Sequence, residues 1–246
     1  MPRLTAENVS VHFGHVRALD DVTIEVERGE IVGLIGPNGS GKTTMVNVIS
    51  GFLTPRSGRV YLDGVEVTSR PPAARAHNGL ARTFQAVRLF GRLTVEENVE
   101  IGALASGASR RETSRRVAAV LERMRLREVR HIRAQDLPYG LERLVSIARA
   151  AVGMPSFFLL DEPAAGLNES ETDELLETLR ATRDDLGCGM IVIEHDMRMM
   201  IKLCPRLYVL DSGSLIANGE PSTVMRDQKV IEAYLGTHKL MTDAEG

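Results

Sequence analysis

The chain has 246 residues, of which 43% are hydrophobic and 26% are charged, with a formal net charge of −3. This balance is typical of a globular protein with one large domain or a domain with an insertion. The slightly acidic charge gives no general argument for binding nucleic acid or anionic lipid. The two cysteines, Cys188 and Cys204, suggest neither a disulfide framework nor a metal site, so we expect a reducing compartment. No apolar run approaches the ~18 residues of a membrane-spanning helix, and the N-terminus lacks the apolar core of a signal peptide.

The first third of the chain reads as strands followed by a helix. Residues 22–26 alternate apolar with polar side chains, which indicates a half-buried strand. Residues 31–35, IVGLI, form an unbroken apolar run, as expected of a strand buried on both faces. Asp63-Gly64 lies between two short β-rich runs and predicts a hairpin. A helix is predicted after residue 41, with one apolar face made of Met45, Val48, Ile49 and Phe52.

Three later apolar runs, at 157–160, 190–193 and 207–210, have the same character as residues 31–35. A helical repeat of leucines lies between the first two runs and ends near Gly187. Buried strands that alternate with helices predict an α/β fold with a central, mostly parallel sheet.

Residues 95–150 break this alternation, because they contain no convincing strand. A helix with apolar residues at 117, 120, 121 and 124 carries a basic opposite face, which we interpret as solvated surface. We therefore predict a helical subdomain at 95–150 inserted into a core formed by 1–94 and 151–246. The last residues, 236–246, are predicted to be a loose tail.

A phosphate-binding loop follows the buried strand 31–35 directly. The segment GPNGSGKTT matches the pattern G-x-x-x-x-G-K-[ST] and leads into the predicted helix. Glycines let successive N–H groups point at phosphate oxygens, and the helix N-terminus adds free donors and a positive dipole end. Lysine is placed to reach the β- and γ-phosphates and the first threonine to bind Mg²⁺. The predicted nucleotide-binding residues are Gly36, Pro37, Asn38, Gly39, Ser40, Gly41, Lys42, Thr43 and Thr44. The alternative is a glycine-rich turn without a ligand.

Polar residues follow two other buried strands. Asp161 suits a position beside the metal, and Glu162 can act as a general base toward water. His195 follows the run 190–193, and in a parallel sheet its strand should end at the same crevice. Considered alone, the acidic pair could simply solvate a strand end, and the histidine could be structural.

Together these motifs resemble the ATPase subunit of ATP-binding cassette (ABC) transporters over almost the whole chain. The resemblance implies a P-loop NTPase fold of ABC type, with an N-terminal antiparallel β subdomain and the inserted helical subdomain. It implies ATP and Mg²⁺ as cofactors, with Phe13 stacking on adenine and Thr43, Gln85 and Asp161 on the metal side. It also implies that Gln85 and His195 assist Glu162 and Lys42 in catalysis. A strand-end core aromatic is the alternative for Phe13.

The segments ARTFQAVRLF, DEPAAGLN, IEHDM and VIEAYLG narrow the resemblance to the first of two ATPase chains in branched-chain amino acid importers. Importers of urea and short amides share much of this pattern. The resemblance implies a head-to-tail dimer with a second ATPase chain, identical or different, in which residues 165–168 contact that chain. It further implies integral membrane permeases, an extracytoplasmic solute-binding protein acting indirectly, and a peripheral location on the cytoplasmic face of the inner or plasma membrane.

Two other classes are less consistent with the motifs. A soluble ABC ATPase acting on nucleic acid or ribosomes usually carries two cassettes or long coiled-coil insertions, and neither is seen here. A P-loop kinase or GTPase would not combine Gln85, DEP and His195, and no N-K-x-D guanine reader is present. We therefore expect no nucleic-acid partner.

The segment LPYGLER occupies the place of the family signature, Leu-Ser-Gly-Gly-Gln. Pro138 stands at the serine position and Leu141 at the glutamine position. Proline offers neither a hydroxyl nor an N–H, although it suits the start of a helix. The N–H groups of Tyr139 and Gly140 remain available to a phosphate. We predict that the ATP site built on this signature binds ATP and hydrolyses it slowly.

Overall fold

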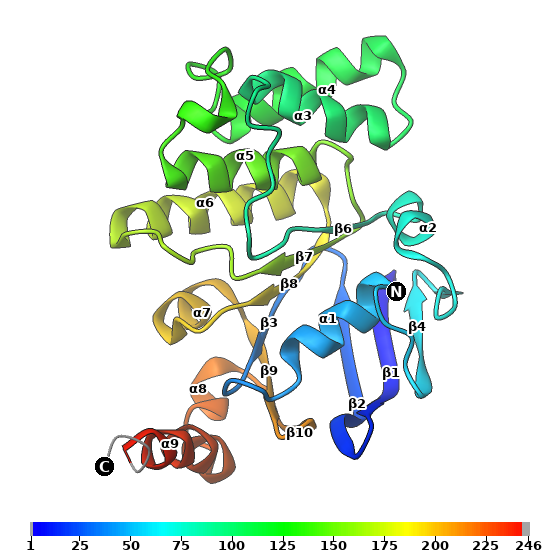
Figure 1. Cartoon of the computed structure of the whole chain (residues 1–246), viewed down its shortest axis with the longest axis vertical. Helices are drawn as coiled ribbons and strands as arrows, with labels where there is room; N and C mark the ends of the chain where they lie inside the picture. Colours follow the sequence, from blue (N-terminus) through cyan, green and yellow to red (C-terminus); the bar gives the residue numbers. More distant parts are fainter. Residues whose placement is uncertain (1, 243–246) are drawn as a thin grey trace.

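A six-stranded sheet forms the centre of the molecule, with strand order β10-β9-β3-β8-β7-β6 (Figure 1). Every neighbouring pair is parallel except β9–β10. The computed structural model describes the backbone of residues 2–242 and the side chains of residues 2–235. The four predicted buried strands are confirmed within it. The strands of this sheet are β3 (Ile31–Ile35), β6 (Leu80–Arg82), β7 (Phe157–Asp161), β8 (Gly189–Ile193), β9 (Arg206–Asp211) and β10 (Ser214–Gly219).

An antiparallel sheet with strand order β2-β1-β4-β5 lies beside the central one. Its strands are β1 (Arg3–Phe13), β2 (Val16–Glu27), β4 (Ser57–Leu62) and β5 (Val65–Glu66). Leu62 pairs with Val65 across the two-residue turn. Asp63 and Gly64 both have positive φ, as a tight hairpin turn requires, so the predicted hairpin is confirmed.

Helix α1 (Lys42–Ser50) follows the phosphate loop and packs Met45, Val48 and Ile49 into the core. The prediction was wrong for Phe52. The helix ends at Ser50, because Gly51 turns the chain with a φ of +80°, and Phe52 is left exposed.

Arg75 lies on α2 (Pro72–His77), and its buried guanidinium binds carbonyl groups at the C-terminal end of α1. It donates to the carbonyls of Val48 (2.5 Å), Ile49 (2.7 Å), Thr68 (2.7 Å) and Arg70 (3.0 Å). Burial lowers the pKa of Arg75 to about 10. A single cation therefore supplies a charged donor to two carbonyls at the end of the helix.

Helices fill the chain between β6 and β7, at the top of Figure 1. They are α3 (Val95–Ala105), α4 (Arg110–Arg123), a short 3₁₀ turn (Ala134–Asp136) and α5 (Tyr139–Ala151). Thr94 and Glu97 form a capping box at the start of α3. The basic face of α4 is paired with acids, since Arg116 contacts Glu112 and Arg123 contacts Asp185.

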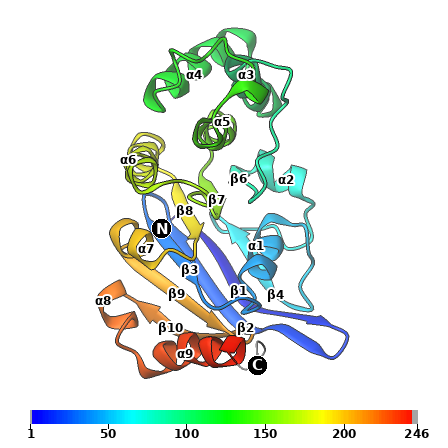
Figure 2. The same cartoon turned by 60° about the vertical axis from the view of Figure 1, so that its left-hand side comes forward.

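The remaining helices are α6 (Glu169–Leu186), α7 (Met197–Leu203), α8 (Pro221–Val224) and α9 (Gln228–Thr242). Figure 2 shows α8 and α9 at the end of the molecule opposite α3 and α4. The backbone of residues 236–242 continues α9, and the loose tail at 236–246 stays a prediction. Extending a helix that has already nucleated costs little. Residues 243–246 lie outside the described part.

The central sheet separates two hydrophobic cores. Ile31 and Ile35 of β3 pack among the residues of α3 to α7, whereas Val32 and Leu34 pack against α1 and the antiparallel sheet. Both faces of β3 are therefore buried, which explains its unbroken apolar sequence. This packing leaves the carboxyl ends of the strands as the place where polar loops meet.

Candidate nucleotide site

The loops after β3, β7 and β8 meet at one edge of the central sheet. These strands are neighbours, since β8 pairs with both β3 and β7. The phosphate loop, Glu162 and His195 line one cleft of about 430 Å³. The structure thus brings together residues that are more than 150 positions apart in the chain.

Glycines give the phosphate loop its shape. Gly41 adopts a φ of +105° immediately before α1, and a Cβ there would lie 2.6 Å from the Ala18 carbonyl. A Cβ on Gly36 would lie 2.1 Å from the Leu210 carbonyl. No side chain caps the N-terminus of α1. The first N–H groups of the helix therefore face the cleft with the positive end of its dipole.

Two polar side chains in this loop fit an incoming phosphate. Lys42 Nζ donates to the carbonyls of Gly36 (2.7 Å) and Pro37 (2.8 Å), so the ammonium lies over the loop. Burial lowers the pKa of Lys42, while the carboxylates of Glu162 and Asp161 act in the opposite direction. Ser40 Oγ is buried and has no hydrogen-bond partner among the described residues. An orphaned hydroxyl beside a lysine is a donor set suited to phosphate oxygens.

Glu162 lies between two side chains that hydrogen-bond to its carboxylate. Gln85 Nε2 donates to Glu162 Oε2 at 2.6 Å, and His195 Nε2 lies 3.0 Å from Glu162 Oε1. The backbone of Glu162 has a φ of +48°, an uncommon conformation for this residue type. Its N–H donates to the Ile193 carbonyl at 2.9 Å, which holds the turn in place. Strained backbone next to a cleft is typical of functional sites.

Asp161 is buried behind the phosphate loop and forms an ion pair with Arg82 at 3.1 Å. The same guanidinium donates to Asn47 Oδ1 (2.7 Å) and Ser50 Oγ (2.9 Å) on α1. It also lies over the ring of Phe84, 4.9 Å from the centroid. Sequence reasoning missed Arg82, because its partners come from three separate segments and no local spacing indicates them.

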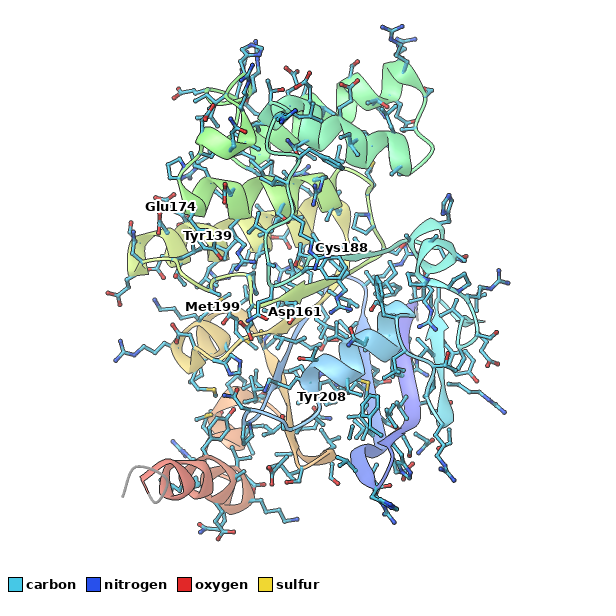
Figure 3. All side chains as sticks on the ribbon, viewed as in Figure 1. Tyr139, Asp161, Glu174, Cys188, Met199 and Tyr208 are labelled. Carbon is cyan, nitrogen blue, oxygen red and sulfur yellow. The ribbon has the colours of Figure 1, made fainter. Side chains whose placement is uncertain are left out.

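Three predicted binding residues do not line this cleft. Phe13, at the end of β1, is 53% exposed, and its register partner Val16 lines the cleft instead. Tyr139 and Gly140 begin α5, beside α6, whereas Asp161 lies at the end of β7 (Figure 3). The Tyr139 hydroxyl accepts a hydrogen bond from Arg143 Nη2 at 2.9 Å.

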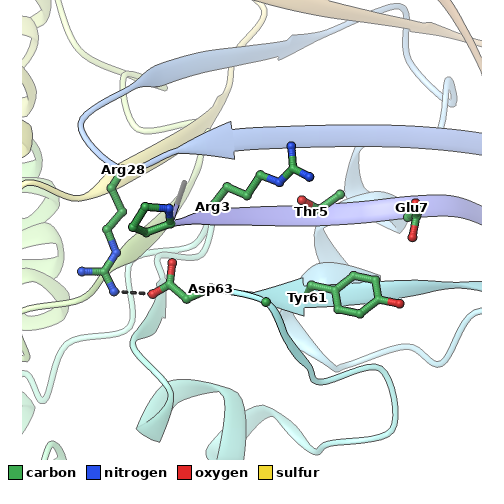
Figure 4. Close-up of a pocket in the computed structure, with 8 residues that line it drawn as sticks. Arg3, Thr5, Glu7, Arg28, Tyr61 and Asp63 are labelled. Carbon is green, nitrogen blue, oxygen red and sulfur yellow. Dashed lines mark hydrogen bonds and ion pairs between the residues drawn. The ribbon is translucent and has the colours of Figure 1, made fainter.

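A hollow of about 740 Å³ lies elsewhere, on the outer face of the antiparallel sheet (Figure 4). Three of the four charged side chains that line it are paired, since Arg28 pairs with Asp63 and Arg3 pairs with Glu25. It therefore offers no set of free polar groups comparable to that of the phosphate loop.

Comparison with known proteins agrees with this geometry. The family described as ABC transporter matches residues 19–165. The chain is 39% identical to the high-affinity branched-chain amino acid transport ATP-binding protein LivG of Escherichia coli K12, covering 96% of this chain and 98% of that protein. The chain belongs to the ABC transporter family. A shorter family match, described as branched-chain amino acid ATP-binding cassette transporter, covers residues 214–239 of this ABC ATPase.

Other relatives are similar over the same length. The Pseudomonas aeruginosa protein BraF, a high-affinity branched-chain amino acid transport ATP-binding protein, is 36% identical over 96% of this ABC ATPase and 98% of its own chain. The ADP conformation of the ATP-binding cassette MJ1267 superposes with a TM-score of 0.86 at 34% identity, covering 96% of this chain and 99% of that one. The predicted fold class and the predicted ATPase are confirmed. In residues 2–242, no helix of the ABC ATPase has the length and apolarity to cross a membrane.

Proposed function

We propose that this ABC ATPase powers an importer of branched-chain amino acids from the cytoplasmic face of the membrane, where it binds permease subunits. The ATPase role rests on one observation: Gln85 and His195 both hydrogen-bond to the Glu162 carboxylate beside the phosphate loop. The solute class is supported by the names of the relatives and by the family match at 214–239.

The phosphate loop binds the triphosphate of ATP. Lys42 exchanges its two backbone acceptors for the β- and γ-phosphates, and Ser40 and Thr44 add hydroxyl donors. When bound, Mg²⁺ would be held by Thr43, Asp161 and Gln85 and would neutralise charge on the phosphates. The free N–H groups of α1 act on the same charge without needing to reorganise.

Glu162 acts as the general base. The water oxygen forms a bond to the γ-phosphorus, the bond from that phosphorus to the bridging oxygen breaks, and the water proton moves to a Glu162 oxygen. In the structure, Gln85 and His195 hold the Glu162 carboxylate. Once ATP is bound, the same two side chains face the attacking water and the γ-phosphate. Each Glu162 oxygen makes one of these contacts and keeps a further lone pair, so the carboxylate can accept a proton while Gln85 and His195 hold it.

A second ATPase chain completes each site head to tail. Phe13 stacks on adenine, while Tyr139, Gly140 and residues 165–168 face the second chain. Pro138 begins α5 without a side-chain cap, so this signature offers the γ-phosphate backbone N–H groups and a helix dipole. The site that this signature completes is therefore the slower of the two.

The segment after β6 is the proposed contact with the permeases. Phe84 and Phe90 are exposed there, and Phe52, in the turn after α1, stacks edge-on against Phe84 at 5.8 Å. Arg88 and Arg149 lie over these rings. Exposed aromatic and arginine side chains are enriched at protein interfaces.

The Glu162→Gln variant tests the proposal in the ATPase assembled with its permeases. Glutamine keeps the size of the side chain and removes its basicity, so ATP binding should persist while hydrolysis falls by about 10²-fold or more. Glu174→Gln, on the exposed face of α6, is the matched control and should leave both unchanged. Turnover at the parental rate in Glu162→Gln would exclude Glu162 as the base.

A transport assay separates the solute classes. Vesicles containing the assembled importer should take up labelled leucine in an ATP-dependent manner and should not take up labelled urea. Uptake of urea alone would reassign the solute while leaving the ATPase role intact.

A further inference from the structure

A buried carboxylate lies next to the proposed site, outside the groups assigned to phosphate, metal or water. Glu194 follows β8 directly, precedes His195 and is 5% exposed. Among the side chains that the structure describes, none forms an ion pair with it. A buried charge without a counter-ion is costly, so its presence requires a compensating function or set of hydrogen bonds.

The two oxygens of Glu194 accept hydrogen bonds from two different segments. Glu194 Oε1 accepts from the Ala164 N–H at 2.7 Å, in the turn after Glu162. Glu194 Oε2 accepts from the His195 N–H at 3.1 Å. The carboxylate thus bridges the turn after the proposed base and the residue that carries the imidazole.

This bridge continues a backbone contact between the same two strands. The Glu162 N–H donates to the Ile193 carbonyl at 2.9 Å, and the Ala165 N–H donates to the Glu162 carbonyl at 3.2 Å. Without Glu194, the Ala164 N–H would lose the only side-chain acceptor that the structure gives it. The positive φ of Glu162 would then be held by fewer contacts.

We propose that Glu194 is a positioning residue for hydrolysis, which holds the Glu162 turn and the His195 backbone in the arrangement that lets both side chains act together. This inference rests on the proposed ATPase mechanism. It assigns a function to a residue that does not itself line the cleft.

The electrostatics of Glu194 separate this role from a purely stabilising one. Burial raises the pKa of Glu194, the two N–H donors and His195 oppose that shift, and the Glu162 charge adds to it. A carboxyl whose pKa is raised on folding lowers stability as the pH rises above its ordinary value of 4.5. Neutralising it should therefore not destabilise the protein strongly at neutral pH, even where it impairs catalysis.

Glu194→Gln tests the proposal, with Glu174→Gln as the control. Glutamine can accept from only one of the two N–H groups through its oxygen and turns an N–H₂ toward the other. We expect kcat to fall at least tenfold in the assembled ATPase, while affinity for a fluorescent ATP analogue stays within about twofold. Such a split between kcat and binding is not expected of general misfolding.

Hydrogen exchange on the purified chain provides a readout that needs no turnover. Peptides covering residues 162–166 and the amide of His195 should exchange faster in Glu194→Gln, and peptides covering residues 36–44 should not change. Glu194→Asp, which keeps the charge with a shorter reach, should recover part of the protection and part of the rate.

The outcomes are distinct. Parental kcat, unchanged exchange, or a loss of ATP affinity in proportion to kcat would each overturn the role of Glu194. If the parent chain itself hydrolyses no ATP in the assembly, the proposed function fails instead, and the exchange data still decide whether Glu194 holds the two segments.

Discussion

Replacing Pro138 with serine restores the hydroxyl that the signature lacks. The position is the N-cap of α5, with φ −61° and ψ 150°, a conformation that a capping serine also adopts. Serine should gain about 0.5–2 kcal/mol as a cap. Loss of proline rigidity should cost about 0.4–1 kcal/mol. Because the two terms nearly cancel, we expect almost no change in thermal stability.

The effect on hydrolysis should be much larger than the effect on folding. A hydrogen bond from serine to the charged γ-phosphate contributes about 1.5–3 kcal/mol. If it forms fully in the transition state, this corresponds to a rate increase of about 10–150-fold. The gain should appear at the site formed by the second chain's phosphate loop and this chain's signature.

The assay uses a Glu162→Gln background, so that the site on this chain's own phosphate loop is inactive. Single-turnover phosphate release in Pro138→Ser with Glu162→Gln then reports on the other site. Pro138→Ala is the matched control, because it removes the proline and adds no hydroxyl. Equal rates in the serine and alanine variants would refute the reasoning. If both ATPase chains are identical, steady-state turnover of Pro138→Ser alone should rise.

Two further predictions concern the fold. Arg75→Ala leaves the carbonyls at the end of α1 without their charged donor, and should cost about 3 kcal/mol. This corresponds to a fall in Tm of about 6–12 °C for a chain of this size, measured by calorimetry against the exposed-site control Arg115→Ala; an equal Tm in both variants would contradict the role of Arg75. Burial raises the pKa of Cys188 to about 11 and that of Cys204 to about 12. Both thiols should therefore resist DTNB at pH 8 until the chain unfolds, and rapid labelling of native protein would show that they are accessible.

The sequence was sufficient for the parts of the fold that depend on local pattern. Residues 31–35 are apolar at every position because both faces of β3 are buried. An unbroken apolar run can be recognised in the sequence without the structure. The hairpin at Asp63-Gly64 follows from the positive φ that both residues tolerate. In the phosphate loop, the backbone passes close to neighbouring segments and a helix begins. Both requirements favour glycine, and they occur within a few residues of each other.

The residues that the sequence did not reveal act over long separations. Arg82 meets Asp161, 79 positions later, and Glu194 meets Ala164, 30 positions earlier. In the sequence, neither Arg82 nor Glu194 stands at a characteristic spacing from its partner, so neither can be told from an ordinary surface charge. The end of α1 was misplaced for a different reason, because its stop signal is local. Gly51 stops the helix, and the helical spacing of Phe52 gives no sign of that stop.

The positions of Glu162 and His195 are set by the sheet itself. β7 and β8 pair in parallel with Asp161 opposite Ile193, so the two residues follow neighbouring strands of a rigid, buried layer. Gln85 follows the three-residue edge strand β6 instead, and its backbone carbonyl accepts a hydrogen bond from Arg143 Nη1 of α5 at 2.8 Å. Gln85 is therefore tied to an edge strand and to α5, whereas Glu162 and His195 are tied to the centre of the sheet. A shift of α5 relative to the sheet would therefore displace the Gln85 amide from the Glu162 carboxylate while Glu162 and His195 keep their places.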